Sequence, residues 1–358
     1  MEKPENVYIC ALKLLMHNAF LVLLVALVSC SKEEETSKTT PETSCRFLKV
    51  SLLSTGGGNV SYGTNSAIEY NAQGQMFRSI DQSKTTYIGG GEKNALATSV
   101  YEYNADGFVT SEKRSAIEDD SKRTENNSLT SQFKYQDGRL SEEISTTIFE
   151  SYYKDTGQTE TYTYNKNTKY EYESGGSMAK ITELNNSSLG GNSASRYYYS
   201  NGRLSRITYQ AGNGPEEDDF TIAEGKIVER KNGSDVTIYK YDSQDRLIRI
   251  EYWNAGQLTG FADQNYDNQK APIETSPQLF LKGWPKQKTI RGEYGNTSNN
   301  IINFRQISIQ GSANVELVSY TFQYEFNTKG IPVKAKLTGT LQGQPYNGEY
   351  TYEYIDCN

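Results

Sequence analysis

The chain has 358 residues, a formal net charge of −7, 28 tyrosines and one histidine. Acidic residues (44) outnumber lysine and arginine (37), so no basic excess favours nucleic-acid binding, and four cysteines are too few for a disulfide-dense scaffold. Leu, Ile, Val and Phe make up roughly a fifth of the chain, a share found in disordered proteins, whereas the small net charge is not typical of them. Composition alone leaves disorder open, and the tyrosines would have to supply the missing apolar area.

Residues 1–29 have the features of a secretory signal peptide. An apolar run from Ala19 to Val28 follows Lys3 and Lys13, and it is shorter than the roughly 20 residues that a membrane-spanning helix needs. The run ends in Leu27-Val28-Ser29-Cys30, which resembles the lipobox of bacterial lipoproteins. The resemblance implies cleavage before Cys30 and acylation of that cysteine, with several acyl chains giving a stable membrane anchor. The alternative is an ordinary signal peptide followed by a chance cysteine.

Residues 30–45 are expected to form a lipidated, flexible tether. Lys32, Glu33 and Glu34 follow the cysteine and resemble the surface-export signal of Bacteroidetes lipoproteins, although a merely solvated charged tether is the alternative. The next stretch, Thr36 to Ser44, is rich in Ser and Thr, as flexible linkers are. We therefore expect a lipid-anchored protein of the bacterial outer membrane, exposed at the cell surface.

Removal of residues 1–29 also removes His17, the single histidine. The mature chain then has no Ser-His-Asp or Cys-His arrangement and no histidine-ligated metal site, so we predict no catalytic residues, no cofactor and no metal. Cys45 and Cys357 remain, near the two ends of the folded part. In an oxidising envelope they could pair, or they could stay as two thiols.

The body of the chain repeats a short pattern. An aromatic-x-aromatic triplet is followed by a polar turn that ends in glycine and then by an apolar residue, as in Tyr101-Glu102-Tyr103-Asn104-Ala105-Asp106-Gly107-Phe108. Residues two apart share one face of a strand, so each copy predicts a β-hairpin with an aromatic face and a polar face. Asp137-Gly138 and Asn201-Gly202 fit two-residue type I′ turns, and longer copies fit a type I turn closed by a left-handed glycine.

The spacing of the copies predicts an all-β domain over residues 46–358. Gly, Asn and Ser interrupt every candidate helix after residue 45, and successive hairpins pair as an antiparallel meander. The aromatic face must be covered, so we expect a curled sheet, a half-barrel or a barrel. Lys and Glu on the other face, without an aliphatic lipid-facing band, indicate a water-soluble protein. Residues 271–300 lack the repeat and are expected to form a long irregular connection.

The best copies, at Tyr239 to Leu247 and Tyr197 to Leu204, resemble the YD (RHS-like) repeat, whose core is Y-x-Y-D-x-x-G-R-L. Small Bacteroidetes lipoproteins with this mixture of features resemble a family of unknown function that has a porin-like β-sheet. The resemblance implies a curled antiparallel meander. It implies no activity and no known binding residues.

Few residues suggest a site. Tyr198, Tyr252, Trp253 and Trp284 are candidates for stacking against a sugar, although most aromatic pairs should instead line the covered face. Tyr198 stands where other copies carry Lys or Glu, so it should face solvent. The acidic run Glu216 to Asp219 is a solvated loop in one interpretation and a calcium site in another. We predict a non-catalytic binding or scaffold module for a glycan or a protein partner, the alternative being a carbohydrate-active enzyme that uses carboxylates.

Overall fold

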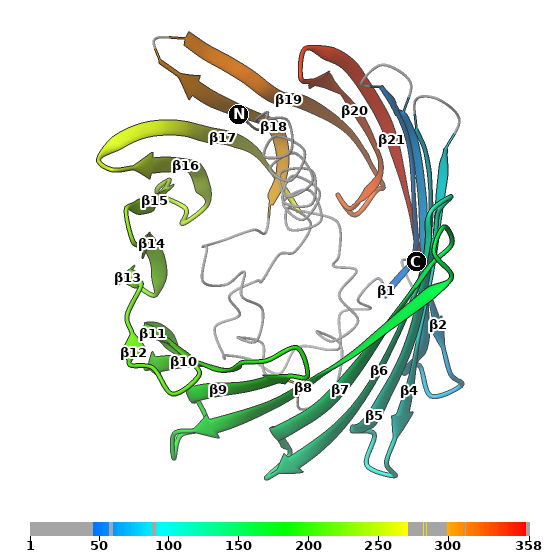
Figure 1. The fold of residues 1–358 in the computed structure, drawn as a ribbon, viewed down its shortest axis with the longest axis vertical. Coiled ribbons are helices and arrows are strands. Elements are labelled where there is room, and N and C mark those ends of the chain that lie inside the picture. Colours follow the sequence, from blue (N-terminus) through cyan, green and yellow to red (C-terminus); the bar gives the residue numbers. More distant parts are fainter. Residues whose placement is uncertain are drawn as a thin grey trace.

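The computed structural model describes residues 46–56, 60–87, 91–270, 282, 284, 299–311 and 313–355. These residues form strands and turns (Figure 1). The strands are β1 (Arg46–Gly56), β2 (Val60–Tyr70), β3 (Met76–Thr86), β4 (Glu92–Tyr103), β5 (Val109–Asp119), β6 (Arg123–Gln136), β7 (Arg139–Tyr153), β8 (Gln158–Tyr172), β9 (Met178–Ser187), β10 (Asn192–Ser200), β11 (Arg203–Ala211), β12 (Glu216–Glu217), β13 (Phe220–Ala223), β14 (Lys226–Asn232), β15 (Asp235–Tyr241), β16 (Leu247–Asn254), β17 (Gln257–Lys270), β18 (Asn299–Gln310), β19 (Ala313–Phe326), β20 (Pro332–Leu341) and β21 (Gln344–Ile355). The described residues contain no helix of the length and apolarity needed to cross a membrane.

The strands form one antiparallel meander. Each strand pairs with its neighbours in sequence except between β12 and β13, and β1 also pairs with β21, so the two ends of the described sheet meet. Among the described strands, β12 pairs only with β11 and β13 only with β14. The sheet therefore curls into a broad ring that stays open at one seam (Figure 1). The predicted all-β meander and curled sheet are confirmed, and the closed barrel among the alternatives is wrong.

The predicted turns are present. Asp137 and Gly138 have φ values of 51° and 73°, and Asn201 and Gly202 have 51° and 72°, as type I′ turns require. Four of the longer turns begin at an Asn or Asp whose carboxamide or carboxylate accepts two backbone N–H groups, at Asn71, Asn104, Asp242 and Asn327. The turn after Tyr172 begins instead at Glu173. The Asn104 Oδ1 accepts from Asp106 N (3.1 Å) and Phe108 N (3.0 Å). This Asx geometry explains why the repeat places Asn or Asp directly after its aromatic pair.

The two faces of the sheet differ in chemistry. We call the face that carries the aromatic pairs the concave face, because the buried core runs along it, and the opposite face the convex face. Tyr101 is 6% exposed on the concave face and belongs to that core. Glu102, between the two tyrosines of its repeat, lies on the convex face with Lys113 (3.5 Å). Similar cross-strand ion pairs recur on the convex face at Lys134–Glu142, Arg249–Asp263 and Lys334–Glu349.

A recurring tyrosine hydrogen bond joins neighbouring strands at seven places in the described sheet. A tyrosine near the end of one strand donates its hydroxyl to the backbone carbonyl of the first apolar residue on the preceding strand. We call this bond the tyrosine clasp. It occurs at Tyr70–Phe47 (2.8 Å), Tyr103–Met76, Tyr172–Leu140 (2.8 Å), Tyr241–Ile227 (2.6 Å), Tyr266–Leu247 (2.9 Å), Tyr324–Ile301 (3.0 Å) and Tyr354–Pro332 (2.9 Å).

Strand β17 continues past its repeat tyrosine to Lys270, and β18 begins at Asn299, inside the range 271–300 expected for the connection. Asp267 follows Tyr266 as Asp follows tyrosine in other copies, and its carboxylate accepts from the backbone N–H groups of Gln269 (3.0 Å) and Asn300 (3.1 Å). These bonds link the end of β17 to the start of β18, where Lys270 pairs with Asn299. Most of residues 271–300 lie outside the described residues, but Trp284 is described, is 8% exposed and packs edge-on against Phe133 with ring centroids 5.0 Å apart.

Apolar side chains pack together at the seam, the break in the backbone ladder between β12 and β13. Leu204 and Ile207 of β11 form a buried cluster with Ile227 of β14, and Phe220 and Ile222 of β13 pack against it. Burial of these apolar groups stabilises the contact in place of ladder hydrogen bonds. The sheet is thus continuous in its packing where its backbone ladder is interrupted.

Candidate functional site

A cavity of about 440 Å³ lies on the concave face over β1 to β6. Its floor follows from the strand register, because residues directly opposite on neighbouring strands share a face. In one row Asp81 faces Ala97, Ala97 faces Ala116, and Ala116 faces Asn127. In the next row Ala95 stands between Ser83 and Glu118. Three alanines in the middle of a face that elsewhere carries larger side chains leave the space that forms the cavity.

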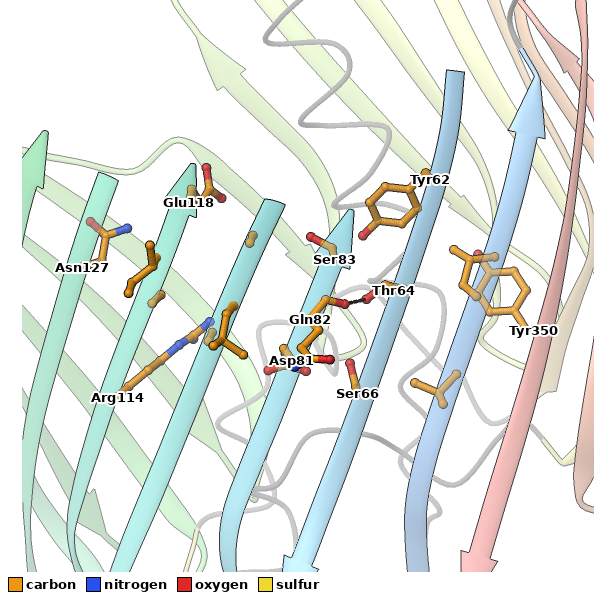
Figure 2. A pocket seen from close by; sticks show the side chains of 17 residues that line it. Tyr62, Thr64, Ser66, Asp81, Gln82, Ser83, Arg114, Glu118, Asn127 and Tyr350 are labelled. Carbon is orange, nitrogen blue, oxygen red and sulfur yellow. Dashed lines mark hydrogen bonds between the residues drawn. The ribbon is translucent and has the colours of Figure 1, made fainter. Parts of the chain in front are cut away.

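Two tyrosine side chains line one side of the cavity. Tyr62 and Tyr350 line it from β2 and β21, and Figure 2 shows both on the same side of the group, with Glu118 and Asn127 at the other. Burial raises the pKa of the Tyr62 hydroxyl above its usual value, so it stays a neutral donor and acceptor at physiological pH. Thr64 is fixed by donating its hydroxyl to the Gln82 carbonyl at 3.0 Å (Figure 2).

The cavity contains charges of both signs. Asp81 and Arg114 are exposed within it, and neither makes an ion pair with the residues that the structure describes. Glu118 already forms an ion pair with Lys93, whose Nζ lies 2.5 Å from the Glu118 Oε2. A carboxylate accepts hydrogen bonds only and a guanidinium only donates them, so Asp81 and Arg114 together offer both capacities to a bound molecule.

A buried polar stripe adjoins the cavity on the concave face. Glu112 is 6% exposed and accepts a hydrogen bond from the Tyr101 hydroxyl at 3.1 Å. Burial raises the pKa of the Glu112 carboxyl, because a desolvated carboxylate is disfavoured. Two strands along, Glu143 accepts from the Tyr170 hydroxyl at 3.2 Å. The described residues contain no group of three or more His, Cys, Asp or Glu that could hold a metal ion.

The four predicted stacking residues do not converge. Tyr198 lies on the convex face, as expected, but its ring is flanked by Lys180 (5.7 Å) and Arg206 (5.8 Å). Tyr252 lies on the concave face, where burial raises the pKa of its hydroxyl to about 12, and Trp253 alternates onto the other face. Trp284 is packed in the core, so its ring is not available for stacking.

Two carboxylates of the acidic run after β11 form ion pairs with arginines. Asp218 pairs with Arg206 at 2.8 Å, and Glu216 lies 3.6 Å from Arg196. The Thr208 hydroxyl donates to Glu216, and this bond, with the nearby arginines, keeps the pKa of the Glu216 carboxyl below its usual value. The geometry favours the solvated, ion-paired loop over a calcium site.

Several predicted features lie outside the described residues. They are the signal peptide 1–29, the tether 30–45, Cys30, Lys32, Glu33, Glu34, Cys45 and Cys357. Lipidation, export and the disulfide therefore stay predictions. The β1–β21 ladder does place Arg46 opposite Ile355, which brings the two described ends together.

Sequence reasoning missed the cavity. No motif marks Asp81 or Arg114, and the alanines of β4 and β5 gain meaning only when they are placed side by side. The one available signal was the alternation in Ala95-Leu96-Ala97, where small residues stand at the positions that share a face with Tyr101. A strand that presents alanine toward a covered face leaves a hollow unless a neighbour fills it.

No protein-family model matches this chain, and no curated protein matches it. Among solved structures, the chain is similar to a porin-like protein from Bacteroides uniformis ATCC 8492, with 15% sequence identity and a TM-score of 0.34. The match covers 89% of this chain and 100% of that one. So distant a likeness carries no argument about activity or location.

Proposed function

We propose that this protein is a non-catalytic binding module, anchored to the outer membrane by a lipid on Cys30 and facing the medium, and that the concave-face cavity takes a glycan. The observation that carries the proposal is the alanine-floored hollow with Asp81 and Arg114 exposed and unpaired within the described residues. Its volume of about 440 Å³ lies within the range of small-molecule sites.

The lining matches the chemistry of a saccharide. Sugar hydroxyls both donate and accept, and the cavity offers an acceptor at Asp81, a donor at Arg114 and an amide with both capacities at Asn127. Tyr62 adds an aromatic wall against which the apolar face of a sugar ring can pack. The two free charges have opposite sign, so the cavity has no strong preference for a charged ligand.

A glycan panel on recombinant residues 46–358 tests the proposal. Arg114→Ala should weaken binding by about tenfold or more, since hydrogen bonds to charged groups contribute roughly 1.5–3 kcal/mol. Ala97→Phe should block the cavity, and Ala67→Phe, which adds the same ring to the convex face of β2, is its control. Failure of every glycan to bind, or equal binding by wild type and Arg114→Ala, would refute the proposal.

The alternative is a carbohydrate-active enzyme that uses carboxylates. The observation in its favour is the buried Glu112 carboxyl with its raised pKa, a property of general acids. Release of reducing ends from a glycan, lost in Glu112→Gln, would establish this alternative and overturn the non-catalytic assignment.

The anchor is tested separately. Cells labelled with palmitate should incorporate label into the wild-type protein and not into Cys30→Ala, and label retained by the variant would refute lipidation at that residue. Protease treatment of intact cells should degrade a surface-exposed protein. Protection from protease would instead indicate the periplasmic leaflet.

A further inference from the structure

A second hollow lies on the convex face and is lined by residues of β7 to β11. Its volume is about 420 Å³. We call it the asparagine groove, after the side chains of Asn165, Asn167, Asn186 and Asn192 that line it. The candidate cavity is built on other strands and on the opposite face, so the two sites are separate.

The strand register arranges the asparagines in a row. Asn165 of β8 faces Asn186 of β9, and Asn186 faces Asn192 of β10. All three are exposed. Neighbouring strands lie about 4.8 Å apart, so the row presents one carboxamide per strand in a line that crosses the sheet.

A second row beside the asparagines supplies apolar surface. Ile144 faces Asn167, Asn167 faces Leu184, and Leu184 faces Ala194. Ile144 is 37% exposed and Leu184 is 44% exposed. The groove therefore joins a line of amides to a line of aliphatic contacts.

The amides retain unused hydrogen-bonding capacity. Asn186 and Asn192 make no side-chain hydrogen bond within the described part of the chain. The Asn167 Nδ2 donates to Glu142 at 3.1 Å, whereas its Oδ1 is buried and has no partner among the described residues. Because that oxygen is already buried, the hydrogen-bonding capacity open to a ligand is that of the exposed Asn186 and Asn192.

The groove offers little free charge. Arg196, its one arginine, lies 3.6 Å from Glu216 and donates to the Gln210 side chain at 3.5 Å and 3.4 Å. Carboxamides bind neutral hydroxyl groups well, because each has both donors and acceptors. A strongly charged ligand would find no unpaired counter-charge among the asparagines.

We propose that the asparagine groove binds a neutral, extended glycan whose chain runs across β8, β9 and β10. One strand spacing is comparable to the length of one pyranose unit, so successive sugars would meet Asn165, Asn186 and Asn192 in turn. The aliphatic row packs against the apolar faces of the rings. The site differs from the concave-face cavity in its strands and in the face on which it lies.

Calorimetric titration of the purified full-length protein tests this. The probes are neutral linear hexasaccharides: cellohexaose, xylohexaose and mannohexaose. The double variant Asn186→Ala/Asn192→Ala should bind the preferred hexasaccharide about tenfold more weakly or worse, since two neutral hydrogen bonds contribute roughly 1–3 kcal/mol. Asn65→Ala, an exposed asparagine on the convex face of β2, should bind as wild type does.

The outcomes separate this site from the cavity. Arg114→Ala should leave hexasaccharide binding at the groove unchanged, even if it abolishes binding in the cavity. Three results would overturn the proposal: no hexasaccharide binds at millimolar concentration, the double variant binds as tightly as wild type, or a neutral peptide competes for the groove while no hexasaccharide does.

Discussion

The tyrosine clasps allow a test in which two nearly identical substitutions have opposite effects. Tyr172 and Tyr135 hold the same place in neighbouring repeats. The Tyr172 hydroxyl donates to the Leu140 carbonyl at 2.8 Å, whereas the Tyr135 hydroxyl is buried and makes no hydrogen bond with the described residues. Replacement by phenylalanine removes one oxygen from each side chain and changes neither charge nor ring packing.

The magnitudes follow from these two environments. A clasp contributes about 0.5–1.5 kcal/mol, and Leu140 is fully buried, so its unpaired carbonyl adds to the loss; Tyr172→Phe should cost about 1–2 kcal/mol. Tyr135→Phe removes a buried hydroxyl that makes no hydrogen bond with the described residues, so the free energy of unfolding should stay equal or rise. Burial raises the pKa of both hydroxyls, that of Tyr172 to about 12, so both are neutral at pH 7.

Urea unfolding at pH 7, followed by circular dichroism, measures both variants of residues 46–358 against wild type. The midpoint should fall for Tyr172→Phe and should hold or rise for Tyr135→Phe. Two equal losses would refute the reasoning, because the hydroxyls would then matter for a reason other than the clasp. No loss in Tyr172→Phe would show that the clasp does not stabilise the sheet.

Three further predictions concern backbone space, burial and the chain ends. Gly339→Ala should lower the melting temperature strongly, because its Cβ would collide with a backbone carbonyl of β19. Gly63→Ala should not, because the atom nearest to its added Cβ, the Leu52 carbonyl oxygen, is 3.8 Å away. Glu112→Gln should be at least as stable as wild type at neutral pH. Because burial raises the folded-state pKa of Glu112, wild-type stability is lost as pH rises from the unfolded value of about 4.5 through the folded pKa. A pH series of melts would show a flatter profile for the variant. Cys45 and Cys357 should appear as one disulfide-linked peptide in a non-reducing digest, and two alkylated thiols would contradict the pairing.

The repeat made the architecture predictable. Two tyrosines two positions apart, Tyr101 and Tyr103, determine which face of the strand is aromatic. Asn104 and Gly107 after them determine the turn. Both are local properties of the sequence. The two-residue turns at Asp137 and Asn201 were predictable for the same reason. The seam was not, because the acidic run Glu216 to Asp219 at that place carries no copy of the repeat.

The cavity depends on register, which local sequence does not contain. Asp81, Ala97 and Ala116 lie on three strands and become neighbours only after each hairpin and its bulge have set the pairing. A slip of one residue would turn all of them to the other face. Residue type alone does not identify a stacking residue, as the buried Trp284 shows, because an aromatic ring is as useful in a core as in a binding site.

The residues of the concave face differ from one end of the strands to the other. Next to the repeat turns it is filled by aromatic and aliphatic residues such as Leu140, which is fully buried. Further along it carries the alanines and charges of the cavity, where Arg114 is exposed. Stability should therefore reside in the first part and binding in the second.

This division predicts a separation of effects. Leu140→Ala should cost about 2–5 kcal/mol, as large-to-small substitutions in a core do, and should leave glycan affinity unchanged at temperatures where the variant is folded. Arg114→Ala should lose glycan affinity and keep the wild-type melting temperature, because an exposed side chain without an ion pair contributes little to folding. Paired melting and titration experiments on both variants check this. A large loss of stability in Arg114→Ala would mean that the arginine supports the sheet, and the cavity would then be a by-product of packing.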